Sequence, residues 1–189
     1  MVAPVSPPLA PVGRWRSENF VADDSALDLA NAISHRRDPA LAEDRVADPG
    51  DLADWARSLC LDAGSAPIVR ADVPLVRAVR EATHDAFAAL AAAGEPSPLS
   101  IAALLRAAAE GFEGRGMPRL HAALAWRAVR ALATLPPGRI GACPACGWLF
   151  PDTSKAGWRR WCAMATCGTA AKVRAFRARA MSAASGAAP

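Results

Sequence analysis

The feature that most constrains this chain is a cluster of cysteines in its last third. Four of the five cysteines in the 189-residue sequence follow the spacing Cys143-x2-Cys146-x15-Cys162-x4-Cys167. Two cysteines three residues apart can turn both sulfurs toward one point, and Gly147 eases the turn that this requires. The spacing therefore predicts one zinc ion (Zn2+) held by these four side chains.

A metal site explains the cluster better than disulfides do. A chain of this length buries enough apolar surface to fold without disulfides, and clustered cysteines in a reducing compartment are usually metal ligands. Four sulfur ligands close the tetrahedral shell of zinc, so the predicted site is structural and has no position for a substrate or a catalytic water. An iron–sulfur cluster takes the same ligands and is the less favoured alternative.

The residues around the cysteines predict a small, treble-clef-like finger. Residues 147–161 read as a β-hairpin, with "WLF" and "WRRW" as its arms and "PDTSKAG" as its turn. Cys167 opens a helix in which Val173, Phe176 and Ala180 share one face and are expected to pack on the finger. Four aromatic residues are assigned to the core of the finger rather than to base stacking: Trp148, Phe150, Trp158 and Trp161.

The pattern CxxCGWLFxDxSxxxxRRWCxMxxCGxxxKxRxFR, over about residues 143–177, closely resembles the CGNR zinc finger family. The matched residues are Cys143, Cys146, Trp148, Leu149, Phe150, Asp152, Ser154, Arg159, Arg160, Trp161, Cys162, Met164, Cys167, Gly168 and Lys172. Proteins of this family pair the finger with an N-terminal ABATE domain, and "LDLANAISHR" and "LADWA" resemble parts of that domain. The resemblance implies a stress-induced transcription regulator with a DNA-binding finger and a ligand-binding N-terminal domain.

The chain departs from the family at the motif that gives the family its name. Where the family has Cys-Gly-Asn-Arg, this sequence has Cys167, Gly168, Thr169 and Ala170. The sulfur ligand is kept, so zinc binding is unaffected. Arginine is the side chain best suited to phosphate or guanine, and alanine cannot replace it in either contact. We therefore expect weak sequence discrimination by the finger alone.

Before residue 139 the sequence predicts helices and no strands. Apolar side chains recur at helical spacing over about 24–37, 51–60, 74–94, 100–111 and 118–135. The candidate N-caps are Asp24 or Ser25, Asp51 and Ser100, and Gly94 suits a helix end. The predicted fold class is mainly α: a helical, ABATE-like domain over 17–137, then the finger over 138–181. Residues 1–16 and 182–189 are expected to be a flexible lead and tail, and the helical domain is expected to fold alone.

A few polar residues of the helical domain are candidates for more than packing. Asn31 shares a helix face with Leu27, and a buried amide must find partners; a structural hydrogen bond is favoured over a ligand contact. Asp28 and Asn31 are the candidate contacts for an unknown small-molecule ligand. Three other residues are assigned to the surface or to packing rather than to a site: Cys60, His84 and His121.

Charge is divided unevenly along the chain. Residues 138–181 hold eight Lys or Arg and one Asp, a net charge of +7, whereas the whole chain is +4, so the rest is 4 − 7 = −3. An excess of this size on a small module predicts a partner with negative charge. The candidate nucleic-acid-binding residues are Arg159, Arg160, Lys172, Arg174, Arg177 and Arg179.

Two functions fit these features. The favoured one is a DNA-binding transcription regulator, in which the helical domain senses a ligand or forms a homodimer and the finger grips DNA. The alternative is an adaptor whose finger docks a protein partner. No nucleophile motif, phosphate-binding glycine loop or open metal site is visible, so we expect no enzymatic activity. The N-terminal segment lacks the pattern of a signal peptide and no membrane-spanning stretch is visible, which predicts a cytoplasmic protein.

Overall fold

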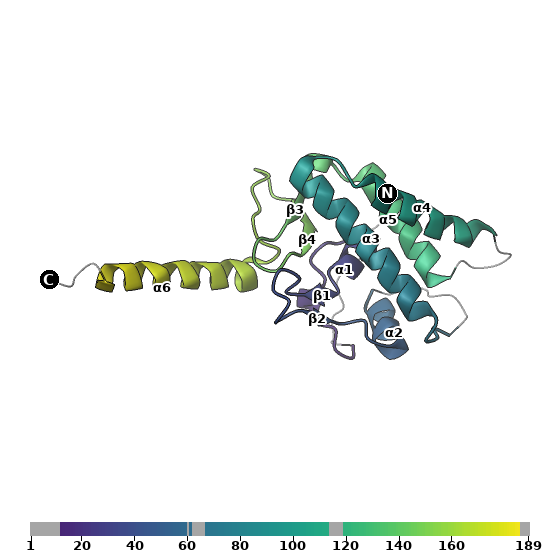
Figure 1. The fold of residues 1–189 in the computed structure, drawn as a ribbon, viewed down its shortest axis with the longest axis horizontal. Coiled ribbons are helices and arrows are strands. Elements are labelled where there is room, and N and C mark those ends of the chain that lie inside the picture. Colours follow the sequence, from purple (N-terminus) through teal and green to yellow (C-terminus); the bar gives the residue numbers. More distant parts are fainter. Residues whose placement is uncertain (1–11, 60, 62–66, 114–118, 186–189) are drawn as a thin grey trace.

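The protein is described here by a computed structural model that covers residues 12–59, 61, 67–113 and 119–185 (Figure 1). Its helices are α1 (Ser25–Ala30), α2 (Pro49–Ser58), α3 (Asp72–Ala93), α4 (Pro98–Glu113), α5 (Leu120–Thr134) and α6 (Thr169–Ser185). Its strands are β1 (Ile33–Ser34), β2 (Glu43–Asp44), β3 (Ile140–Ala142) and β4 (Leu149–Pro151). The prediction of a mainly α fold with a C-terminal cysteine finger is confirmed.

Helices α3, α4 and α5 pack on one another and form the bulk of the molecule (Figure 1). Valines and leucines recur on one face of α3, and the helix ends at Gly94, whose φ of 78° is a left-handed conformation that glycine adopts without strain. The main core joins Val76 of α3 to Leu104 of α4, Leu124 of α5 and Trp55 of α2. The helices are thus held by one shared apolar interior.

The predicted helix starts are only partly right. The side chain of Asp24 caps α1 by accepting hydrogen bonds from the backbone N–H groups of Ala26 and Leu27, as expected. Helix α2 is capped by Asp48 and not by Asp51, because Pro49 occupies its first turn, where a missing N–H costs nothing. Helix α4 begins at Pro98 rather than after Ser100 for the same reason.

The prediction of no strands before residue 139 is wrong. Strands β1 and β2 pair in antiparallel fashion, with Ile33 opposite Asp44. Each strand has two residues, too few for an alternating pattern to show in the sequence. The buried guanidinium of Arg80 on α3 fixes β2, with its Nη1 2.6 Å from Asp44 Oδ1 and its Nε 2.6 Å from Glu81 Oε1.

Both expected flexible ends are shorter than predicted within the described residues. Trp15 belongs to the main core, and its indole Nε1 donates to the carbonyl of Asp51 at 2.9 Å. At the other end, α6 continues as far as Ser185. Residues 1–11 and 186–189, and with them most of the lead and tail, lie outside the described residues, as does Cys60.

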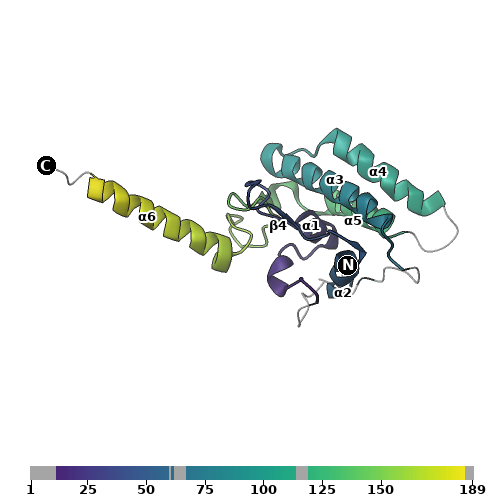
Figure 2. The ribbon, with the colours of Figure 1, turned by 60° about the horizontal axis from the view of Figure 1, so that its bottom comes forward.

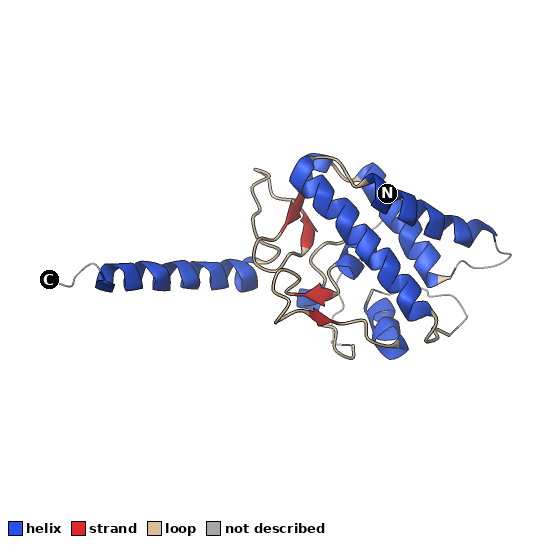
Figure 3. Cartoon of the chain, in the orientation of Figure 1, coloured by secondary structure: helices blue, strands red, loops and turns tan. Residues whose placement is uncertain are grey.

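Strands β3 and β4 lie at one end of the helical layer, and α6 leaves the molecule from there (Figures 1 and 3). The hairpin packs against α3, and β4 also contacts α1. Ile140 and Leu149 enter a second core cluster with Leu27, Phe87 and residues of α5. The finger and the helical body therefore share an apolar interior across the predicted boundary at residue 137.

Candidate metal centre and its basic helix

The first two cysteines lie in the loop that joins β3 to β4. Ile140 pairs with Pro151 and Ala142 with Leu149, so Cys143 and Cys146 sit at the end of this ladder. The backbone N–H of Cys143 donates to the carbonyl of Trp148, and that of Gly147 donates to the carbonyl of Cys143, both at 2.8 Å. Gly147 has a φ of 84°, which confirms the expected role of glycine in this turn.

The predicted arms of the hairpin are wrong in part. The "WLF" arm contributes to β4, but its partner is β3, which precedes the first cysteine. The "WRRW" segment, 158–161, contains no strand. A strand of three residues before Cys143 gives too short a pattern to compete with the longer loop as a hairpin signal. Cys162 is instead carried to the site by an irregular segment.

Cys167 reaches the site from a short π-helical turn, Met164–Gly168, that runs directly into α6. Gly168 packs closely in this turn, because a Cβ there would lie 2.5 Å from the sulfur of Met164 and 3.2 Å from the ring of Trp161, so a larger residue would have to displace the Met164 side chain. The expectation that the fourth ligand opens the final helix is confirmed to within two residues. This turn lets one continuous helical segment start at the metal site.

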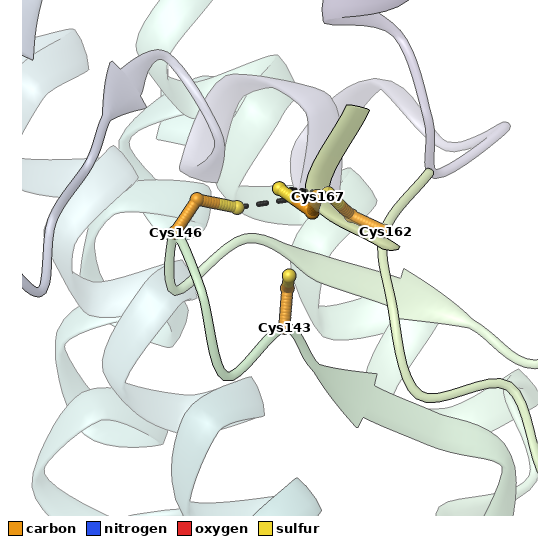
Figure 4. Close-up of side chains that lie close together, drawn as sticks. All are labelled: Cys143, Cys146, Cys162 and Cys167. Carbon is orange, nitrogen blue, oxygen red and sulfur yellow. Dashed lines mark hydrogen bonds between the residues drawn. The ribbon is translucent and has the colours of Figure 1, made fainter. Parts of the chain in front are cut away.

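The four sulfurs converge on one point (Figure 4). All lie within 4.8 Å of one another, and the Cys146–Cys162 and Cys162–Cys167 sulfur pairs are each 3.6 Å apart. Zinc–sulfur bonds of about 2.3 Å place the corners of a tetrahedron about 3.8 Å apart. Three of the cysteines are buried and Cys167 is half-buried. The residues therefore fit a zinc ion with adjustments of at most about 1 Å.

The mutual effects of the cysteines on their pKa values also favour a bound cation. Hydrogen bonds from Cys146 and Cys162 lower the pKa of Cys143. The same contact with Cys143 raises the pKa of Cys146 and of Cys162, because neighbouring sulfurs cannot all carry negative charge unaided. A divalent ion removes this conflict and allows four thiolates. The donor set, the distances and the closed shell together make this a structural zinc site.

Two charged residues of the 151–162 loop organise the ligands. Arg159 stacks its guanidinium 4.5 Å above the ring of Phe150 and donates to the carbonyls of Trp161, Pro151 and Cys162. The buried carboxylate of Asp152 accepts from the N–H of Arg159 at 2.8 Å. A hydrogen bond from the Ser154 side chain, together with those from the backbone, lowers the pKa of Asp152. Arg159 thus holds the finger together from within, a role that sequence reasoning missed.

Asn31 links the helical body to the finger. Its Nδ2 donates to the carbonyl of Leu149 and its Oδ1 accepts from the N–H of Leu149, both at 2.8 Å. The amide is buried, and both its N–H and its oxygen form structural hydrogen bonds, the role that the sequence favoured. The indole of Trp148 adds a second link by donating to the carbonyl of Ile33 at 2.8 Å.

Asp28 is buried one helical turn before Asn31. Its Oδ1 accepts from the N–H of Ala22 at 3.0 Å, which fixes the loop before α1. Burial raises the pKa of Asp28 to about 8. A ligand contact by Asp28 or Asn31 stays a prediction. His84 and His121 face carboxylates, at 3.4 Å from Asp85 and 2.8 Å from Glu110, and neither belongs to the cysteine cluster.

The basic residues separate into two groups. Arg159 faces inward as described, whereas Arg160 is exposed and lies 4.8 Å above the ring of Trp161. The four exposed basic residues of α6 form no ion pair within the described part of the chain: Lys172, Arg174, Arg177 and Arg179. The expected packing of this helix on the finger is wrong, since Phe176 is 66% exposed. The finger interior is already filled by Trp148, Phe150 and the Arg159 stack.

The assignment of the finger aromatics to the core holds for Trp148 and Phe150, which are buried, and Trp161 is half-buried. It is wrong for Trp158, which is 88% exposed. Trp158, Arg160 and Trp161 line a surface hollow of about 450 Å³. Trp148 and Trp161 lie next to or near a zinc-ligating cysteine in the sequence, whereas Trp158 follows the turn-rich stretch "PDTSKAG". This position is the sequence signal that distinguishes Trp158 from these two tryptophans.

The comparisons agree with this geometry. Residues 139–180 match the sequence model of the CGNR zinc finger, a range that contains the hairpin, all four cysteines and most of α6. No curated protein matches the chain. Among the described residues, no helix is both long and apolar enough to cross a membrane. The chain therefore carries a zinc finger domain of CGNR type whose four cysteines are placed to bind zinc.

Proposed function

We propose that this protein is a DNA-binding transcription regulator. In this proposal the zinc finger and α6 grip DNA, and the helical body senses a small molecule or forms a homodimer. The match to the CGNR zinc finger supports the finger's part in this role. An ABATE-type body and a stress-induced role, both implied by the family resemblance, belong to the same proposal.

The observation that carries the proposal is the position of α6. The helix stands clear of the body in both views of the chain (Figures 1 and 2). It spans 17 residues, about 25 Å at 1.5 Å per residue, and it holds four basic residues and no acidic one. A cationic helix of this length whose basic side chains are exposed has the dimensions that the major groove of DNA admits.

The finger adds contacts next to this helix. Arg160 is exposed, and its guanidinium already lies over an aromatic ring, where it remains free to meet phosphate. The exposed indole of Trp158 offers a flat face for a sugar or a base. Ala170 on the first turn of α6 cannot read a base, so phosphate contacts should dominate the affinity.

The test is the salt dependence of duplex DNA binding by the zinc-loaded full chain. Five exposed basic groups, Arg160 and the four of α6, give a log–log slope of roughly −4 to −5, since each phosphate contact contributes about −0.9. Lys172→Ala and Arg177→Ala should each reduce the magnitude of this slope by about one. Arg106→Ala, which removes an exposed arginine from α4, is the matched control and should change nothing.

The outcome that contradicts the proposal is equally concrete. Zinc-loaded protein that fails to shift duplex DNA at ~50 mM salt, where nonspecific phosphate contacts are strong, cannot be a DNA-gripping regulator. The basic helix would then be expected to meet an acidic protein surface.

A further inference from the structure

A cleft of about 310 Å³ lies where the helical body meets the finger. One wall is formed by Arg127 and Arg130 of α5 and by Leu135, which directly follows this helix. The second is the loop before α1, with Asp23 and Asp24. Pro151 and Thr153, at the end of β4, form the third wall. The volume is at the lower end of the range of small-molecule sites, which suits a compact ligand.

The cleft carries unpaired charges of both signs. Arg127 and Arg130 are exposed and lie one turn apart on α5, so they share a face. Neither arginine, nor Asp23 or Asp24, forms an ion pair with any residue of the described chain, although they line the same space. Burial raises the pKa of Asp24 and the nearby charges of Arg127 and Arg130 lower it, but no direct contact pairs these groups, so two cations and two anions face one opening.

Hydrogen bonds from the backbone hold the Asp24 carboxylate, and the backbone conformation sets the position of Asp23. Oδ1 of Asp24 accepts from the N–H groups of Ala26 and Leu27, at 2.9 and 3.2 Å, which fixes the side chain at the start of α1. Asp23 has a φ of 51°, a left-handed conformation that few non-glycine residues adopt. Asp28 supports this loop from below by accepting from the N–H of Ala22. The Asp24 carboxylate is thus preorganised, which lowers the cost of binding.

We propose that this cleft binds a small zwitterion of the α-amino acid class. Arg127 and Arg130 take its carboxylate, and Asp23 and Asp24 take its ammonium group. Leu135 and Pro151 supply the apolar surface for its side chain. A dianion would meet the two aspartates and a dication the two arginines, so a molecule with one charge of each sign fits best.

Such a ligand touches both parts of the protein. Arg127 and Arg130 belong to the helical body, whereas Pro151 and Thr153 lie between the zinc ligands Cys146 and Cys162. A ligand that bridges these walls stabilises the arrangement in which the finger rests on the body. This inference goes beyond DNA binding and does not depend on it.

The test is isothermal titration of the zinc-loaded full chain with each standard amino acid, in the absence of DNA. At least one should bind with a Kd below about 1 mM, a modest affinity for so small a ligand. Its N-acetyl and its carboxamide derivatives should each bind at least about tenfold more weakly, because each loses one charge. Equal binding of either derivative, or no binding by any amino acid at about 10 mM, overturns the proposal.

Isosteric variants make the test independent of folding. Asp24→Asn keeps an N-cap of equal quality, and Asp23→Asn keeps a residue that tolerates positive φ. Each should weaken binding about tenfold or more with the thermal transition of the free protein retained, as should Arg130→Gln. Arg106→Gln on α4 is the matched control. Unchanged binding by all three cleft variants would also overturn the site, and none of these results bears on the DNA assay.

Discussion

At the scale of single residues, two polar side chains, of Asn31 and Arg159, hold the finger through hydrogen bonds to backbone groups. The need of Asn31 for a partner is visible in the sequence, because an amide on an apolar helix face must form hydrogen bonds. Its partner is not visible, because Leu149 lies 118 residues away and pairs through its backbone, which every residue has. The structural role of Arg159 was missed for the same reason, because it donates to backbone carbonyls, which every residue has.

Replacing Asn31 tests this link. Asn31→Ala leaves the buried N–H and C=O of Leu149 without partners and should lower the free energy of unfolding by roughly 2–4 kcal/mol. Asn19→Ala is the matched control, because Asn19 is also buried but accepts one local hydrogen bond, from the N–H of Arg16. Urea unfolding of both variants should show the larger loss for Asn31, and an equal or smaller loss would contradict the link.

Asp28 predicts a specific dependence of stability on pH. Burial raises its pKa from 3.8 to about 8, so the folded protein binds a proton that the unfolded chain releases. The proton on Asp28 contributes fully to the free energy of unfolding below about pH 4. This contribution falls by at most roughly 1.4 kcal/mol for each pH unit and is lost as the pH rises to about 8. Asp28→Asn should flatten this slope and raise stability at pH 8, measured by thermal unfolding across pH. An unchanged slope would show that Asp28 is ionised in the fold.

At the scale of elements, the strength of each sequence signal decides what could be predicted. The long helices α3 and α5 and the cysteine knuckle have long or chemically specific patterns, and they are found where expected. Strands of two or three residues carry no periodicity, so β1 and β2 were missed and β3 was misplaced. The isolation of α6 was missed because its apolar stripe resembles that of a packed helix.

Removal of zinc should unfold the finger as an element. The purified protein should hold one zinc per chain, and structural zinc contributes roughly 10–16 kcal/mol of apparent binding energy in small fingers. Cys146→Ser should abolish the metal and the order of the hairpin, as measured by elemental analysis and hydrogen exchange. Cys60→Ala should keep a full equivalent, because Cys60 is not part of the four-cysteine spacing that predicts the site. Iron in place of zinc, or well under one equivalent of metal in fresh wild-type protein, would contradict the site.

At the scale of the whole molecule, the finger is part of the interior of the protein rather than an appendage. Ile140 and Leu149 pack with Leu27 and Phe87, and Asn31 ties the same strand to α1. The sequence suggested a division at residue 137, because the composition changes there and all the strong helical patterns lie before it. Packing across that point depends on residues between 53 and 122 positions apart, which no local pattern reports. That the helical domain folds alone stays a prediction, and the shared packing argues that its stability alone is lower.

Truncation separates the two parts of the C-terminal region. A chain ending at Pro137 loses two buried apolar side chains worth about 1.5–3 kcal/mol each, together with the partner of the buried Asn31. It should therefore unfold several degrees to tens of degrees lower than the full chain, or fail to fold. A chain ending at Ala171 keeps all four cysteines and the shared interior and removes α6 after its first three residues, so its melting temperature should lie close to that of the full chain. The same chain should lose DNA binding, because it lacks the four basic residues of α6.

If instead the chain ending at Pro137 melts cooperatively at the temperature of the full protein, the contacts of Ile140, Leu149 and Asn31 do not contribute to stability, and the finger is an independent module after all.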